Sequence, residues 1–167
     1  KNWKLMSTRN YKKQVHLLLS ALPLVANENC FALHGGTAIN LFLNNMPRLS
    51  VDIDLTYLPV ENRDTSMDNI NKALHRISQQ IEAFLPGTNV FHLLKEAKLI
   101  VSDREAGIKV EVNTIKRGCY TLPVSRTLCE NAQRQFEAFC EIQLVDNAHL
   151  FGGKICAALD RQHPRDL

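Results

Sequence analysis

The sequence predicts an α/β fold in which a mixed β-sheet is flanked by helices. Segments with apolar residues at helical spacing stand near both ends of the chain, whereas short strand-like runs are grouped in the middle. The composition, with 45% hydrophobic and 22% charged residues, is that of an ordinary globular domain with a substantial core. We therefore expect residues 1–167 to form a single domain. Because the chain starts without Met and stops directly after a charged stretch, we expect this domain to be truncated at its C-terminus.

The first predicted element is an amphipathic helix over residues 9–22, where apolar side chains recur at helical spacing. Pro23 has no backbone N–H and is expected to end this helix. A short apolar run over residues 30–34 is the first strand candidate. Two glycines then turn the chain, and Thr37 is the expected N-cap of a helix that runs to Leu43.

The middle of the chain predicts a strand, a long helix and a series of further strands. Residues 51–58 alternate between apolar and polar side chains, as a half-buried strand does. Residues 64–85 carry an apolar helical face, and Pro86-Gly87 is expected to end that helix. Further strands are expected over residues 89–94, 98–102, 107–113, 120–124 and 140–145. Residues 126–138 favour a loop and a short helix, and residues 149–161 a helix weakened by paired glycines.

The composition also argues against several classes of protein. Five cysteines, an odd number without C-x-x-C spacing, disfavour a disulfide framework or a zinc site and favour the reducing cytoplasm. No apolar run approaches the length of a membrane span, and no signal-peptide pattern opens the chain. The net charge of +3 is compatible with anionic ligands such as nucleotides or RNA, but no strongly basic stripe is present.

A pair of aspartates lies in the strand predicted over residues 51–58. Because successive side chains of a strand point to opposite faces, Asp52 and Asp54 should share one face while their aliphatic neighbours pack on the other. Adjacent carboxylates repel each other. Magnesium prefers oxygen ligands and often takes one or two carboxylates together with substrate phosphates. The pair therefore fits a clamp for magnesium and a nucleoside triphosphate (NTP); solvated aspartates on an exposed strand edge are the alternative.

A third carboxylate is expected from the strand over residues 107–113. Glu111 alternates with aliphatic residues, and it would join the aspartates if this strand pairs beside theirs. Three carboxylates can hold two metal ions, one at the attacking oxygen and one at the leaving group. A half-exposed surface strand with alternating Lys and Glu is the alternative.

The glycine pair Gly35-Gly36 sits between a predicted strand and a predicted helix. Glycines let backbone N–H groups approach an anion, and a helix N-terminus favours negative charge. This turn would suit phosphates, although a tight strand-to-helix turn without a ligand has the same pattern. In the last predicted helix, Lys154 and Arg161 stand seven residues apart and share a helix face, where they could neutralise a triphosphate or simply be solvated.

These motifs together resemble a known family. Residues 34–38 (HGGTA) and 48–55 (RLSVDIDL) resemble the first motif of the AbiEii/AbiGii-type nucleotidyltransferase toxins, members of the DNA-polymerase-β-like nucleotidyltransferase superfamily. Residues 150–161 (LFGGKICAALDR) and 165–167 (RDL) resemble the later family motifs. The resemblance spans roughly residues 30–167 and implies a polymerase-β-like fold, a mixed sheet with flanking helices.

The resemblance also implies roles for individual residues. The metal ligands would be Asp52, Asp54 and, less securely, Glu111. The nucleotide-binding positions would be Gly35, Gly36, Thr37, Arg48, Ser50, Lys154 and Arg161. The catalytic residues would be Asp52, Asp54, Glu111, Lys154 and Asp166. Glu111 would also help to deprotonate the acceptor.

The expected reaction moves a nucleotidyl group from an NTP to an acceptor hydroxyl, with Mg²⁺ as cofactor. The resemblance implies a tRNA or other RNA end as acceptor, toxicity within a toxin–antitoxin or abortive-infection system, and a cognate antitoxin as partner. Two alternatives are open: a nucleotide-sugar glycosyltransferase, which can also use a D-x-D pair, and a catalytically silent nucleotide- or RNA-binding module. The glycine turn and the Lys154 helix argue against the first. The intact carboxylates argue against the second, because a silent fold has no need to keep repelling charges together.

Overall fold

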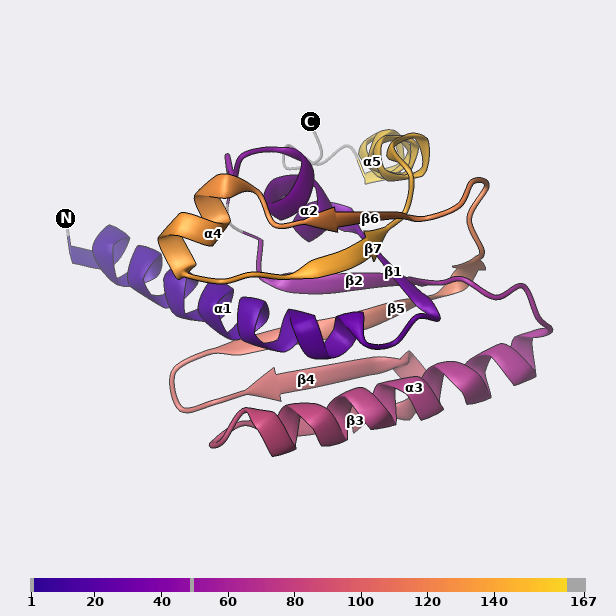
Figure 1. Cartoon of the computed structure of the whole chain (residues 1–167), viewed down its shortest axis with the longest axis horizontal. Coiled ribbons are helices and arrows are strands. Elements are labelled where there is room, and N and C mark those ends of the chain that lie inside the picture. The colour runs from indigo at the N-terminus through magenta and orange to yellow at the C-terminus, as the bar shows by residue number, and fades with distance from the viewer. Residues whose placement is uncertain (1, 49, 162–167) are drawn as a thin grey trace.

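A seven-stranded mixed sheet forms the centre of the molecule (Figure 1). The computed structural model describes residues 2–48 and 50–161. The strands are β1 (Phe31–His34), β2 (Asp52–Tyr57), β3 (Asn89–Leu93), β4 (Lys98–Ser102), β5 (Gly107–Arg117), β6 (Val124–Thr127) and β7 (Glu141–Leu144). Their order across the sheet is β3-β4-β5-β2-β1-β7-β6. The predicted fold class, a mixed sheet flanked by helices, is confirmed.

Strand β2 holds the central position of this sheet. It runs antiparallel to β1 on one side and parallel to β5 on the other. Beyond β5, strands β4 and β3 continue the sheet as antiparallel neighbours. Beyond β1, β7 runs parallel and β6 closes the edge antiparallel to β7. Because β2 and β5 are parallel, the chain between them must cross over, and it does so through α3 and the β3–β4 pair.

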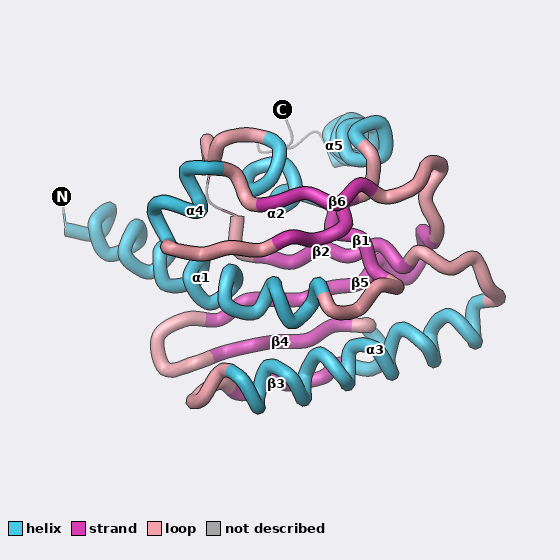
Figure 2. Tube along the Cα trace, viewed as in Figure 1, coloured by secondary structure: helices cyan, strands magenta, loops and turns pink. Residues whose placement is uncertain are grey.

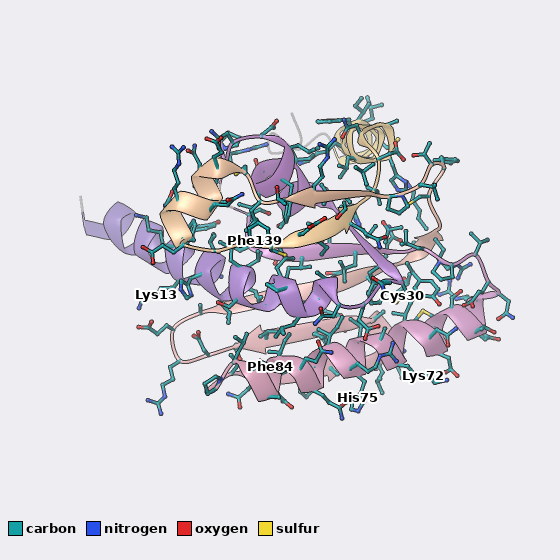
Figure 3. All side chains as sticks on the ribbon, in the orientation of Figure 1. Lys13, Cys30, Lys72, His75, Phe84 and Phe139 are labelled. Carbon is teal, nitrogen blue, oxygen red and sulfur yellow. The ribbon has the colours of Figure 1, made fainter. Side chains whose placement is uncertain are left out.

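Two long helices cover one face of the sheet (Figures 1 and 2). Helix α1 (Asn2–Ala26) contacts β2, β5 and β7, and α3 (Arg63–Phe84) contacts β3 and β4. Lys72 and His75 lie on the exposed side of α3 (Figure 3), while its apolar stripe faces the sheet. The core is the aliphatic layer between these helices and the strands. In the described residues, no helix is both long and apolar enough to cross a membrane.

The remaining helices are α2 (Gly35–Ala38), the π-helical turn η1 (Ile39–Leu43), the 3₁₀ turn η2 (Leu94–Glu96), α4 (Glu130–Phe136) and α5 (Asn147–Arg161). Helix α2 follows β1 without a loop and contacts both β2 and α5. These contacts bring α5 to the same region as the glycine turn.

The first helix does not end where the sequence predicted. It continues past Pro23 to Ala26. Proline removes one intrahelical hydrogen bond, to the carbonyl four residues earlier, which costs less near a helix end than in its middle. The side chains of Leu22 and Val25, on either side of Pro23, are almost completely buried and anchor the last turn in the core. Tertiary packing therefore outweighs the proline.

Two further expectations were wrong. Thr37 is not an N-cap, because α2 begins two residues earlier with His34 in the N-cap position. No strand covers residues 120–124, where Tyr120 and Leu122 are 96% and 87% exposed and nothing anchors them to the sheet. The strand in this region is β6, which begins at Val124.

Candidate functional site

The aspartate pair lies on the sheet face that α1 and α3 leave uncovered. In β2, Asp52 is exposed and Asp54 is half-buried, whereas Ile53 and Leu55 are fully buried on the opposite side. This is the alternation that the sequence predicted, but it holds only over residues 52–55, because Thr56 and Tyr57 are both buried. The apolar side fixes the register, because a slip by one residue would place both carboxylates in the core.

Glu111 lies beside this pair. Strand β5 runs parallel to β2, with Asp54 opposite Glu111 and Asp52 opposite Lys109. Glu111 is exposed while Val110 is fully buried, so Glu111 shares the aspartate face. The predicted pairing of these two strands, with three carboxylates on one face, is confirmed.

The Glu111 side chain nevertheless has a partner of its own. Its Oε2 atom lies 3.5 Å from the Lys98 Nζ atom, and Lys98 also lies 3.0 Å from Glu96. Within residues 2–48 and 50–161, no three His, Cys, Asp or Glu side chains are gathered in a metal-binding arrangement. The three carboxylates therefore share a face, while Glu111 is held by an ammonium group on the neighbouring strand β4.

Asp54 is the carboxylate most affected by its surroundings. Burial has the largest effect on its pKa, the charges of Asp52 and Glu111 act in the same direction, and Lys154 opposes them; the result is a pKa raised to about 6. The folded chain thus holds a half-buried acid beside two like charges, with one ammonium group near enough to act on it. A bound cation would relieve this repulsion, and carboxylate oxygens suit a hard divalent ion. Asp52 and Asp54 therefore fit a divalent metal, whereas the Glu111 side chain is paired with Lys98.

The glycine turn packs directly against Asp54. Gly35 has a φ of +74°, and a Cβ atom at this position would lie 2.3 Å from the Asp54 Oδ2 atom. A Cβ on Gly36 would lie 3.2 Å from the Ser50 Oγ atom. Glycine at position 35 is thus required both by its left-handed conformation and by the carboxylate above it.

Polar side chains fix this turn to the beginning of β2. The buried Thr37 hydroxyl donates to the main-chain carbonyl of Asp52 and lies 2.9 Å from the Ser50 hydroxyl. The Asn40 amide donates to the Gly36 carbonyl at 2.8 Å. Asn40 is a supporting residue that the sequence patterns did not reveal, because a buried Asn in a helix has no motif of its own.

The structure describes the other predicted nucleotide-binding residues to differing degrees. Lys154, on α5, is half-buried and near enough to Asp54 to lower its pKa. Arg48 is exposed on the segment that precedes β2. Arg161 is the last residue of α5, and its side chain lies outside the described part of the structure, as does the whole of Asp166.

His34 is another neighbour of Asp54. It lies opposite Asp54 in the β1–β2 pair, and its Nδ1 atom lies 3.1 Å from the Thr56 hydroxyl. Burial, followed by the charges of His149 and Lys116, lowers its pKa to about 4. The imidazole is therefore neutral at neutral pH.

A pocket of about 820 Å³ opens next to this region, between the end of β5 and the first half of α5. Its polar lining includes Lys116, Arg117, Tyr120 and His149. The sequence patterns did not single out these residues, and the segment from Cys119 to Pro123, part of which was predicted to be a strand, is an irregular loop.

The fold is that of a nucleotidyltransferase toxin. MenT4, a nucleotidyltransferase toxin from Mycobacterium tuberculosis H37Rv, matches this chain with a TM-score of 0.59 and 17% sequence identity. The match covers 87% of this chain and 51% of MenT4, so the chain spans about half the length of that protein. At this level of identity the likeness concerns the fold.

Residues 17–167 match the family model for the "Nucleotidyl transferase AbiEii toxin, Type IV TA system". This range is most of the chain, and the protein belongs to the AbiEii family of nucleotidyltransferase toxins. The resemblance predicted from the sequence motifs is thus confirmed. No curated protein matches the chain.

Proposed function

We propose that this protein is a metal-dependent enzyme that transfers a nucleotidyl group from an NTP to an acceptor hydroxyl and releases pyrophosphate. The acceptor oxygen attacks the α-phosphorus, and the bond from that phosphorus to the pyrophosphate oxygen breaks. The proton of the acceptor hydroxyl passes to a carboxylate of the β2–β5 face, for which we favour Glu111. The proposal rests on the family membership and on the site geometry together.

The observation that carries the proposal is the crowding of carboxylates around Asp54. A half-buried acid with a pKa near 6, facing Asp52 and Glu111, disfavours the empty folded state. We propose that Asp52 and Asp54 hold Mg²⁺, with Glu111 as the third carboxylate. Mg²⁺ would neutralise charge on the triphosphate and on the leaving pyrophosphate.

The triphosphate would lie between the glycine turn and α5. Gly35 and Gly36 let this turn pack closely against Asp54 and Ser50, and we propose that the first N–H groups of the continuous turn formed by α2 and η1 contact the phosphates. Lys154 supplies a positive charge from the opposite side, and we propose Arg48, Ser50 and Arg161 as further contacts. Thr37 supports the turn through its hydrogen bond to β2, in addition to its predicted contact with phosphate. These groups would stabilise the negative charge that develops on the phosphates during transfer. Asp166 remains a predicted catalytic residue.

The acceptor and the biological setting follow from the family. We propose an RNA end, such as that of tRNA, as the acceptor, toxicity as the result, and a cognate antitoxin as the partner that restrains it. The proposed location is the cytoplasm, where NTPs and RNA are present. An abortive-infection role is part of the same proposal.

Transfer of label from α-³²P-labelled NTPs to total RNA in the presence of Mg²⁺ tests this function. Wild-type protein should label RNA, whereas Asp52→Asn and Asp54→Asn should not. Asp68→Asn on the exposed face of α3 is the matched control and should retain activity. Transfer from a nucleotide sugar instead would support a glycosyltransferase. Nucleotide binding without any transfer would support a silent binding module.

A further inference from the structure

The pocket beside α5 is lined by none of the residues to which the reaction described above assigns a role. It is formed by the end of β5, the following loop and the first half of α5. Lys116 and His149 line it, and both act on the pKa of His34, the strand partner of Asp54. The pocket therefore borders the proposed transfer site through His34.

Polar atoms in this pocket lack partners. In the described part of the chain, three side-chain atoms are buried without a hydrogen bond: Arg117 Nη1, Asp146 Oδ2 and His149 Nδ1. All three residues line this one pocket. Buried polar atoms without partners are rare and cost free energy. Their concentration here points to a ligand that offers both hydrogen-bond donors and acceptors.

An aromatic platform stands at the same pocket. The Tyr120 ring is 96% exposed, and its centroid lies 6.2 Å from that of the His149 imidazole at an interplanar angle of 51°. Exposed aromatic rings of this kind stack on nucleobases regardless of sequence. Lys116 and Arg117 add positive charge at the same wall, which suits a phosphate.

We propose that this pocket binds a nucleotide unit. The base stacks on Tyr120 and His149, its polar edge faces Arg117 and Asp146, and its phosphate lies near Lys116. This inference rests on the proposed function and deepens it, because both substrates of the proposed reaction contain a nucleotide unit. These are the NTP, through its base, and the acceptor RNA, through its terminal nucleotide. Both present the same planar, anionic group.

Binding of nucleoside monophosphates, measured by calorimetry without catalysis, tests the pocket. AMP, CMP, GMP and UMP serve as probes, and ribose 5-phosphate is the probe without a base. At least one monophosphate should bind more tightly than ribose 5-phosphate. Tyr120→Ala should weaken that binding about tenfold, whereas Tyr120→Phe should retain it. Phe91→Ala, which removes an exposed aromatic ring from β3 at the other end of the sheet, is the matched control and should have no effect.

A second variant fills the pocket without disturbing the fold. A Cβ atom at Gly152, in the part of α5 that lines the pocket, would have no heavy atom within 4 Å. Gly152→Leu should therefore abolish monophosphate binding while the melting temperature stays the same or rises, since leucine favours helix over glycine. Gln79→Leu on the exposed face of α3 is the control for an added leucine.

Steady-state kinetics identify the substrate that occupies the pocket. A raised KM for RNA alone in Tyr120→Ala assigns the terminal nucleotide of the acceptor, and a raised KM for NTP alone assigns its base. The proposal is overturned if monophosphates bind no more tightly than ribose 5-phosphate, or if both Tyr120→Ala and Gly152→Leu bind like the wild type. The calorimetric result does not depend on transfer, so failure of the proposed reaction would be recognised separately.

Discussion

The two faces of β2 and β5 differ in what their side chains do for the fold. One face packs fully buried aliphatic side chains, such as Leu55 and Val110, beneath α1. The other gathers Asp52, Asp54 and Glu111, whose charges repel one another. The first face contributes stability through burial, and the second opposes it. Stability and the proposed chemistry are therefore separable in the same pair of strands, and substitutions on each face should have opposite effects.

The largest expected effect is on the buried face. Leu55→Ala leaves a cavity in the core and should lower the free energy of unfolding by about 2–5 kcal/mol. Urea denaturation measures this loss. Ile115→Ala, which removes an 81% exposed side chain from β5, is the control and should change stability by less than about 0.5 kcal/mol. Equal losses in the two variants would contradict the assignment of faces.

The next effect concerns the contact between the glycine turn and Asp54. Gly35→Ala should destabilise the protein more than Gly87→Ala, although both glycines have positive φ. A Cβ at Gly87 meets no atom within 4 Å, so that variant carries only the backbone strain of about 1–2 kcal/mol. The excess in Gly35→Ala measures the clash with the carboxylate. Combining Gly35→Ala with Asp54→Ala should recover that excess, and additive losses would show that the clash is absent.

The pH dependence of stability should distinguish Asp54 from its strand partner His34. The Asp54 pKa is raised from 3.8 to about 6, so its contribution to stability falls as the pH rises from about 4 to 6. The His34 pKa is lowered from 6.5 to about 4, so its contribution rises between about pH 4 and 6.5. The two effects oppose each other, each on the order of 2–3 kcal/mol, and should partly cancel in the wild type.

Single substitutions reveal each effect in urea denaturation followed from pH 4 to 7. Relative to the wild type, Asp54→Asn should gain stability as the pH rises, and His34→Gln should lose it. Parallel curves for the three proteins would contradict the burial of these two groups.

The smallest effect on stability is expected at Lys154. Lys154→Ala should change the free energy of unfolding by no more than about 0.5 kcal/mol, as for most surface substitutions. It should nevertheless raise the KM for NTP, because it removes positive charge beside Asp54. Lys72→Ala on the exposed side of α3 is the control for charge. Unchanged kinetics in Lys154→Ala would exclude a role in phosphate binding.

Periodic features of this molecule could be predicted from the sequence. The strict alternation of residues 51–58 and 107–113 placed the carboxylates on one face, because aliphatic residues on the other face permit only one register. The predicted α3 differs from the observed helix by one residue at each end, since Asn62 caps it and Pro86 follows it. Side-chain roles were harder to predict. Thr37 was expected to cap a helix, whereas its hydroxyl donates a hydrogen bond to β2.

Features that depend on distant contacts could not be predicted. From the local sequence, Pro23 is expected to end the first helix. The buried side chains around it explain why α1 continues to Ala26. The Lys98–Glu111 pair requires knowledge that β4 lies beside β5. The pocket at α5 is lined in part by the loop before β6, where the sequence predicted a strand over residues 120–124 and the structure has none before Val124.

The parallel pairing of β2 with β5 has a consequence for how the protein folds. The two strands that carry the carboxylates are separated in the chain by α3, β3 and β4. Such non-local pairing closes a long loop and is slow compared with helix formation or an adjacent strand pair. Asp54 and Glu111 therefore come together late on the folding pathway. The proposed site should be absent from any intermediate that contains only α1, β1 and β2.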